Sequence, residues 1–116
     1  DDYINIPRIQ LHKSSETYYS VLFHELIHST GAVSRLNRET LNKIVYWGDE
    51  VYSEEELVAE LGASFLAAMT GIDQESLFEN SVAYLQSWLS KLKDDKQLIF
   101  RASAAAQKAV NYLVSK

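Results

Sequence analysis

The pentapeptide His-Glu-Leu-Ile-His at residues 24–28 constrains this chain more than any other stretch, because its spacing has chemical meaning on a helix. His24 and His28 are four residues apart, so on a helix they share one face, one turn from each other. Their imidazoles can then converge on a single ion. Zinc suits neutral imidazole nitrogen, and a catalytic zinc site has three protein ligands and one open position for water. Glu25, beside the first histidine, has the position of a general base toward that water.

The residues around this motif predict a helix over about 16–30. Ser14 or Ser15 can cap its start, and Gly31 predicts a left-handed cap at its end. Polar groups inside a core need partners, and one metal ion would satisfy both imidazoles. Burial on several sides is expected because apolar residues cover much of the helix, namely Tyr18, Val21, Leu22, Phe23, Leu26 and Ile27.

The composition limits the classes of protein to which this chain can belong. The 116 residues are enough for one domain with its own core, spanning 1–116. The chain has no cysteine, so any metal must be bound by histidine and carboxylate, and this usage fits a reducing cytoplasm. A net charge of −5 argues against non-specific binding to nucleic acid. No apolar run approaches the ~18 residues that a membrane span requires.

A third metal ligand must come from downstream, where Glu56 and Glu60 are four residues apart on a second helix, which is predicted to begin at Ser53. We expect Glu56 to bind the ion and Glu60 to orient a ligating histidine. In the alternative, Glu56 completes a capping box with Ser53, and Glu60 becomes the ligand. Glu54 and Glu55 then read as ordinary acids of the first helical turn. An unpaired charge at Glu60, among apolar neighbours, would be costly, so both arrangements give this residue a role.

Two segments outside the strong helices also bear on the site. Tyr3–Ile6 alternates apolar and polar residues before a proline, which is typical of a short edge strand. Residues 46–52 combine aromatic side chains with a glycine and predict a surface loop. Tyr46 and Tyr52 either line the substrate cleft or pack beneath this loop. A lone loop histidine, His12, is interpreted as solvated.

The remainder of the chain has helical periodicity. A short helical segment is predicted over 39–45, Gly71 ends the second long helix, and further helical segments follow over 73–78, 81–92 and 96 to about 114. The expected fold is therefore α+β but mostly helical, with a minimal strand component. In it the helix that carries HExxH packs against the helix that carries the acidic pair.

A bare HExxH arises by chance in roughly one of a few hundred chains of this length, but further segments here resemble the zincin-like metallopeptidase domain of ArdC-type antirestriction proteins. The resemblance covers essentially the whole chain and implies a gluzincin-like site. In that site His24, His28 and Glu56 are zinc ligands, and Glu25 is the catalytic glutamate. The segments are Tyr18-Tyr19, residues 22–31, Arg35-Leu36-Asn37-Arg38, residues 55–63, residues 84–89 and residues 102–112.

The resemblance implies a zinc-dependent metallopeptidase, a hydrolase associated with mobile elements and with the protection of incoming DNA from restriction. Members of that family also carry an N-terminal region that binds single-stranded DNA. The chain begins at Asp1 without methionine, so we expect a fragment of a longer protein whose DNA contact and further strands lie upstream. The expected partner is a protein or peptide in the cytoplasm, not a membrane. An unpaired strand edge would allow a homodimer.

A second hypothesis assigns the chain to a different class. The domain would be a metal-stabilised binding module in antirestriction with weak or vestigial peptidase activity. Glu25 argues against this hypothesis, because a purely structural zinc site needs no general base.

Overall fold

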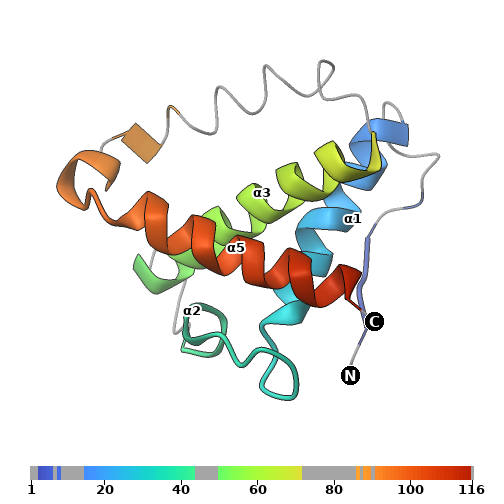
Figure 1. Ribbon diagram of the computed structural model, residues 1–116, viewed down its shortest axis with the longest axis horizontal. Coiled ribbons are helices and arrows are strands. Elements are labelled where there is room, and N and C mark those ends of the chain that lie inside the picture. Colours follow the sequence, from blue (N-terminus) through green and yellow to red (C-terminus); the bar gives the residue numbers. More distant parts are fainter. Residues whose placement is uncertain are drawn as a thin grey trace.

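The computed structural model describes residues 3–6, 8, 15–43, 50–71, 86, 88–89 and 91–115. The helices with defined bounds are, in chain order, α1 (Ser15–Thr30), α2 (Glu39–Asn42), α3 (Glu50–Thr70) and α5 (Leu98–Val114). Residues 86, 88–89 and 91–94 are also helical. Figure 1 shows α5 crossing over α1 and α3, while α2 lies beyond the C-terminal end of α1. In this part of the chain no helix combines the length and the apolar character that would be needed to cross a membrane.

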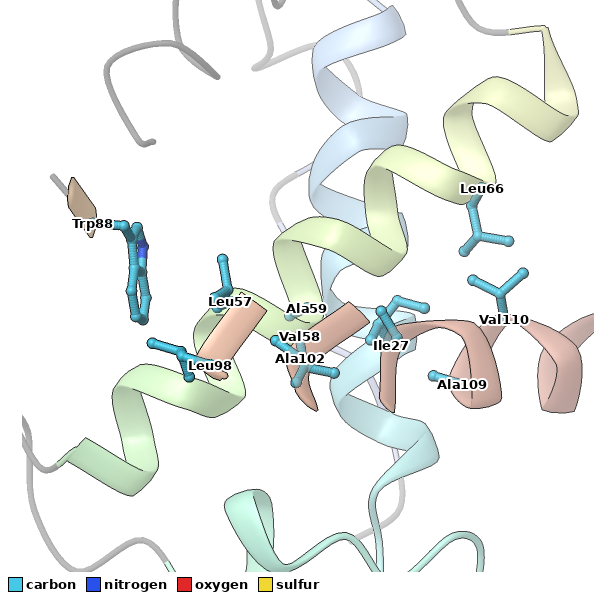
Figure 2. Close-up of a cluster of buried hydrophobic side chains, with 11 residues drawn as sticks. Ile27, Leu57, Val58, Ala59, Leu66, Trp88, Leu98, Ala102, Ala109 and Val110 are labelled. Atoms are coloured by element: carbon cyan, nitrogen blue, oxygen red, sulfur yellow. The ribbon is translucent and has the colours of Figure 1, made fainter. Parts of the chain in front are cut away.

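The core lies where the three long helices meet. Ile27 of α1 and Val58 of α3 are completely buried, and so are three alanines of α5: Ala102, Ala106 and Ala109. Figure 2 shows the cluster of buried side chains, which these helices and Trp88 contribute. The alanines share one face of α5, and because their side chains are short, α5 can pack closely on the other two helices.

The crossing of α1 and α3 depends on Gly62. A Cβ atom added to this glycine would lie 2.6 Å from Cδ1 and 2.7 Å from Cγ1 of Ile27, closer than real Cβ contacts. Ile27 therefore fills the space that a side chain at residue 62 would occupy. This contact lets the two helix backbones approach closely at the level of His24 and His28.

Several helical predictions are confirmed. The helix expected over 16–30 is α1, the short segment after residue 39 contains α2, and the last helix is α5. Gly71, with φ of 76°, ends α3 in the left-handed conformation. Of the helix predicted over 81–92, the described residues 86, 88–89 and 91–92 are helical as expected, but the helix continues to Asp94, where a break was predicted. The segment predicted over 73–78 lies outside the described residues.

The predicted left-handed cap at Gly31 is wrong. Among the described residues, Gly71 is the glycine with positive φ, and Gly31 serves a different purpose. A Cβ atom on Gly31 would lie 2.8 Å from Nη2 of Arg38 and 3.0 Å from Cδ2 of Leu41. Glycine is needed here because the Arg38 guanidinium passes directly over the end of α1.

The predicted capping box at Ser53 is also wrong, because α3 begins at Glu50, one turn earlier. Ser53 lies inside the helix, and its hydroxyl accepts a hydrogen bond from Nζ of Lys91 at 2.6 Å. Local sequence patterns do not define helix ends reliably. No proline or glycine between residues 50 and 53 prevents the helix from starting before Ser53. Glu56 therefore has no capping role.

The strand expected over Tyr3–Ile6 is not confirmed. These residues have no regular secondary structure, and no strand is found in the rest of the described chain. A strand is stabilised by a neighbour that completes its hydrogen-bonded ladder, and an isolated extended segment has none. The strand edge that would support a homodimer is likewise not seen in these residues, so the homodimer stays a prediction.

We predict that Gly62→Ala destabilises the domain, although alanine is the better helix former by about 1 kcal/mol. The added methyl group collides with Ile27, and overpacking of this kind costs about 1–3 kcal/mol. Thermal or urea unfolding followed by circular dichroism measures the change. In an Ile27→Ala background the same substitution should be nearly neutral or stabilising. A Gly62→Ala variant that is more stable than the parent would contradict the packing described here.

Candidate metal centre

His24 and His28 lie on the face of α1 that is turned toward α3, and both side chains are largely buried. Their Nε2 atoms are 3.1 Å apart, and their ring centroids are 4.7 Å apart. The HExxH motif therefore does place two imidazoles against each other on one helical face. At this distance the two Nε2 nitrogens can share one proton or bind one ion.

Glu56 reaches both imidazoles from α3. Its Oε1 atom is 2.8 Å from Nε2 of His28, and its Oε2 atom is 3.3 Å from Nε2 of His24. Ligand atoms of the three side chains all lie within 4.8 Å of one another. Two imidazoles and one carboxylate form a donor set that could hold zinc or a similar divalent ion.

Glu60 follows Glu56 by one helical turn and contacts the opposite side of His24. Its Oε2 atom is 3.2 Å from Nδ1 of His24, while Glu56 faces Nε2 of the same ring. The two carboxylates therefore occupy different positions around His24. In this arrangement Glu56 faces the point between the two histidines, and Glu60 contacts the His24 ring at Nδ1, on the side away from that point.

Glu55 holds His28 in the same way, and the sequence analysis missed it. Its Oε2 atom is 2.7 Å from Nδ1 of His28, and the residue is completely buried. Interpreting Glu55 as an ordinary first-turn acid followed from starting the helix too late. Helical periodicity could have predicted the burial of Glu55, though not its partners, because Glu55 shares a face of α3 with the buried residues Val58, Ala59 and Gly62.

Of the other predicted site residues, the structure describes Glu25 fully and Tyr52 in part. Glu25 lies on α1 beside His24, and its side chain is partly exposed. Tyr46 and His12 lie outside the described residues. Tyr52 was expected in a loop, but its backbone belongs to α3, and its side chain is outside the described part. A role for either tyrosine in the cleft stays a prediction.

The carboxylates of the cluster raise the pKa of both imidazoles. Burial lowers the pKa of His24, but hydrogen bonds and the charges of Glu56 and Glu60 outweigh burial and raise that pKa to about 9. Burial also opposes charge on His28, yet hydrogen bonds to Glu55 and Glu56 raise its pKa above the ordinary value. Burial alone would raise the pKa of Glu56, but hydrogen bonds from both histidines lower it to about 2. An ion that binds the imidazole nitrogens must therefore displace protons.

We expect the affinity for zinc to rise with pH. Below the His24 pKa of about 9 the ion competes with a proton, so each proton released contributes up to about tenfold in affinity per pH unit. Calorimetric titration with Zn²⁺ between about pH 6 and pH 8, in buffers of different ionisation enthalpy, measures both the affinity and the protons released. Zinc binding that releases no proton and does not change with pH would contradict this assignment.

Comparisons with known proteins show which family the chain resembles. The sequence profile of a family described as zincin-like metallopeptidase matches residues 1–105. The crystal structure of the antirestriction protein ArdC from plasmid R388, in an Mn(II)-bound form, superposes with a TM-score of 0.71 at 44% sequence identity. The match covers 96% of this chain and 40% of ArdC. A metal-free structure of ArdC matches equally well, with a TM-score of 0.71.

Two further proteins that carry other names are also similar to this chain. DNA primase TraC of Escherichia coli is 35% identical over 114 residues, which is 98% of this chain and 8% of TraC. An uncharacterized protein of Sinorhizobium fredii, y4eC, is 30% identical over 112 residues, 97% of this chain and 35% of that protein. The chain thus spans well under half the length of each relative. These matches confirm the resemblance to ArdC-type proteins on which the sequence analysis relied.

Proposed function

The chain belongs to the zincin-like metallopeptidase family, and we propose that it is a zinc-dependent peptidase domain of an ArdC-like antirestriction protein. One observation carries the proposal. Two helices bring Nε2 of His24, Nε2 of His28 and the carboxylate of Glu56 to a common point. Each imidazole is also held at Nδ1 by a further carboxylate, which is the usual support of a ligating histidine.

The charges of the cluster fit a divalent ion. Glu55, Glu56 and Glu60 face the two histidines, and Arg38 neutralises one of these carboxylates. One divalent ion between neutral imidazoles would balance the remaining two negative charges.

We assign His24, His28 and Glu56 as the ligands. Imidazole-rich donor sets favour zinc over manganese at equal availability, so zinc is proposed here although the ArdC relative was crystallised with Mn(II). When bound, such an ion supplies Lewis acidity toward water and toward a substrate carbonyl.

The chain's own residues complete the proposed reaction. The carboxylate of Glu25 accepts a proton from the attacking water and passes it to the nitrogen of the departing amine. Glu60 keeps the ring of His24 oriented through Nδ1. Glu25 needs access to solvent and substrate for this task, and its side chain is partly exposed.

We predict that Glu25→Gln retains zinc and loses peptidase activity. Glutamine keeps the size of the side chain but cannot accept the proton, so kcat/KM should fall by about 10²–10⁴-fold. Cleavage of fluorescent casein and elemental analysis of bound zinc give the two measurements. Glu39→Gln is a matched control, because Glu39 is exposed on α2 and pairs with Lys43. Full activity in Glu25→Gln would rule out the assigned role.

Glu25→Gln and a second variant, His24→Ala, distinguish the alternative, a metal-stabilised binding module with weak catalysis. In that case protection of incoming DNA, measured in cells with the full-length protein, would survive Glu25→Gln and be lost in His24→Ala. Loss in both variants favours the peptidase.

The proposed partners follow from what the chain contains and from its relatives. A protein or peptide substrate would bind beside the metal centre, in the cytoplasm. Contact with single-stranded DNA is assigned to a part of the longer protein outside this chain, in keeping with the net charge of −5. Tyr46 and Tyr52 remain the proposed cleft residues.

A further inference from the structure

We propose that Glu55 is a positioning residue that fixes the ring of His28 for metal binding, and that Arg38 and Thr40 hold Glu55 in place. The proposal rests on the function proposed above and assigns a residue that acts on the metal ligand without touching the ion. It is built on the hydrogen bonds of one buried carboxylate.

The carboxylate of Glu55 has every acceptor position in use. Oε1 accepts hydrogen bonds from Nε of Arg38 at 2.8 Å and from Oγ1 of Thr40 at 2.7 Å. Oε2 accepts from Nη2 of Arg38 at 2.8 Å and lies 2.7 Å from Nδ1 of His28. Because a carboxylate offers about four acceptor sites, its position and orientation are fully determined by these partners.

Stability alone does not explain this buried pair. A buried ion pair is often no more stable than well-packed apolar residues of similar volume, because both charges lose their hydration. The Glu55 side chain is 1% exposed and the Arg38 side chain is 9% exposed, so the loss of hydration is nearly complete. What apolar residues could not provide is the acceptor directed at Nδ1 of His28.

Arg38 ties this carboxylate to the same turn of α1 that carries His28. Its Nη2 atom also donates to the carbonyl oxygen of Ile27 at 2.9 Å, and its Nη1 atom donates to Oγ1 of Thr30 at 2.9 Å. The guanidinium is therefore fixed to the end of α1, over Gly31. Movement of His28 and movement of Glu55 are thus restricted by one shared anchor.

The consequence for His28 is a fixed tautomer. When Nδ1–H donates to Glu55, the lone pair of the neutral ring lies on Nε2, which faces Glu56. His24 and Glu60 form a similar pair, but the Glu60 side chain is 33% exposed whereas that of Glu55 is 1% exposed. Glu55 therefore restricts its histidine more strongly than Glu60 does.

Glu55→Gln tests the proposal. Glutamine places an amide N–H₂ group against the donors of Arg38 or His28, so at least one of the hydrogen bonds is lost. We expect zinc affinity, measured by competition with a chromogenic chelator, to fall about 10–100-fold, while circular dichroism shows a folded domain. The matched control is Glu54→Gln on the neighbouring residue, which pairs with Arg101 instead and should keep the parental affinity.

A spectroscopic measurement separates positioning from a general loss of stability. In the zinc-loaded protein, proton NMR should show the Nδ1–H signals of both histidines. In Glu55→Gln the signal of His28 should move upfield or exchange faster with solvent, whereas the signal of His24, held by Glu60, should not change. Equal changes at both histidines would indicate a non-specific structural effect and overturn the proposal.

The remaining outcomes are also decisive. A folded Glu55→Gln variant with parental zinc affinity and an unchanged His28 signal overturns this inference and leaves the proposed function intact. If the parent chain itself binds no zinc, the proposed function fails and this inference fails with it. Should Glu55→Gln not fold, the isosteric Thr40→Val, which removes one donor to Glu55, decides the question by the same two measurements.

Discussion

The close crossing of α1 and α3 is the constraint on which the candidate site depends. The site draws its imidazoles from one helix and its carboxylates from the other, and these side chains meet directly because Ile27 occupies the space left open at Gly62. The same contact belongs to the buried core, so the packing that stabilises the domain also sets the distance between His28 and Glu56. Fold and site are therefore coupled through one helix–helix contact.

The three acidic side chains of α3 have different surroundings and hence different tasks. Glu56 lies between the Nε2 atoms of the histidines, whereas Glu60 and Glu55 each contact an Nδ1 atom. Glu55 is buried and bound to Arg38, while Glu60 is partly exposed. Each imidazole is consequently held on both ring nitrogens. This leaves little rotational freedom in the groups that would bind an ion.

The sequence predicted the parts of the site that helical spacing determines. His24, His28, Glu56 and Glu60 each belong to a pair at a spacing of four, and the structure brings the two pairs together. The network around Glu55 was not predicted, because it depends on the path of the chain after α1. No local pattern shows that the Arg38 guanidinium returns over Gly31 to the end of that helix.

The errors have the same origin. Gly31 was interpreted as a left-handed cap and Ser53 as a helix start from local preferences. The Arg38 guanidinium instead lies over Gly31, and α3 begins one turn before Ser53. The edge strand over Tyr3–Ile6 is not confirmed, because strand formation requires a neighbour that local sequence cannot supply. Family membership, by contrast, was correctly inferred from several motifs in combination.

The central claim is that His24, His28 and Glu56 bind one divalent ion, and anomalous diffraction at the zinc edge from crystals grown with Zn²⁺ tests it most directly. We predict a single peak at about 2.0–2.2 Å from both Nε2 atoms and from an oxygen of Glu56, with Glu60 on Nδ1 of His24. A peak bound by Glu60 in place of Glu56 would reverse the assignment of the two carboxylates. The absence of any peak at the histidines would contradict the account of this site as a metal centre.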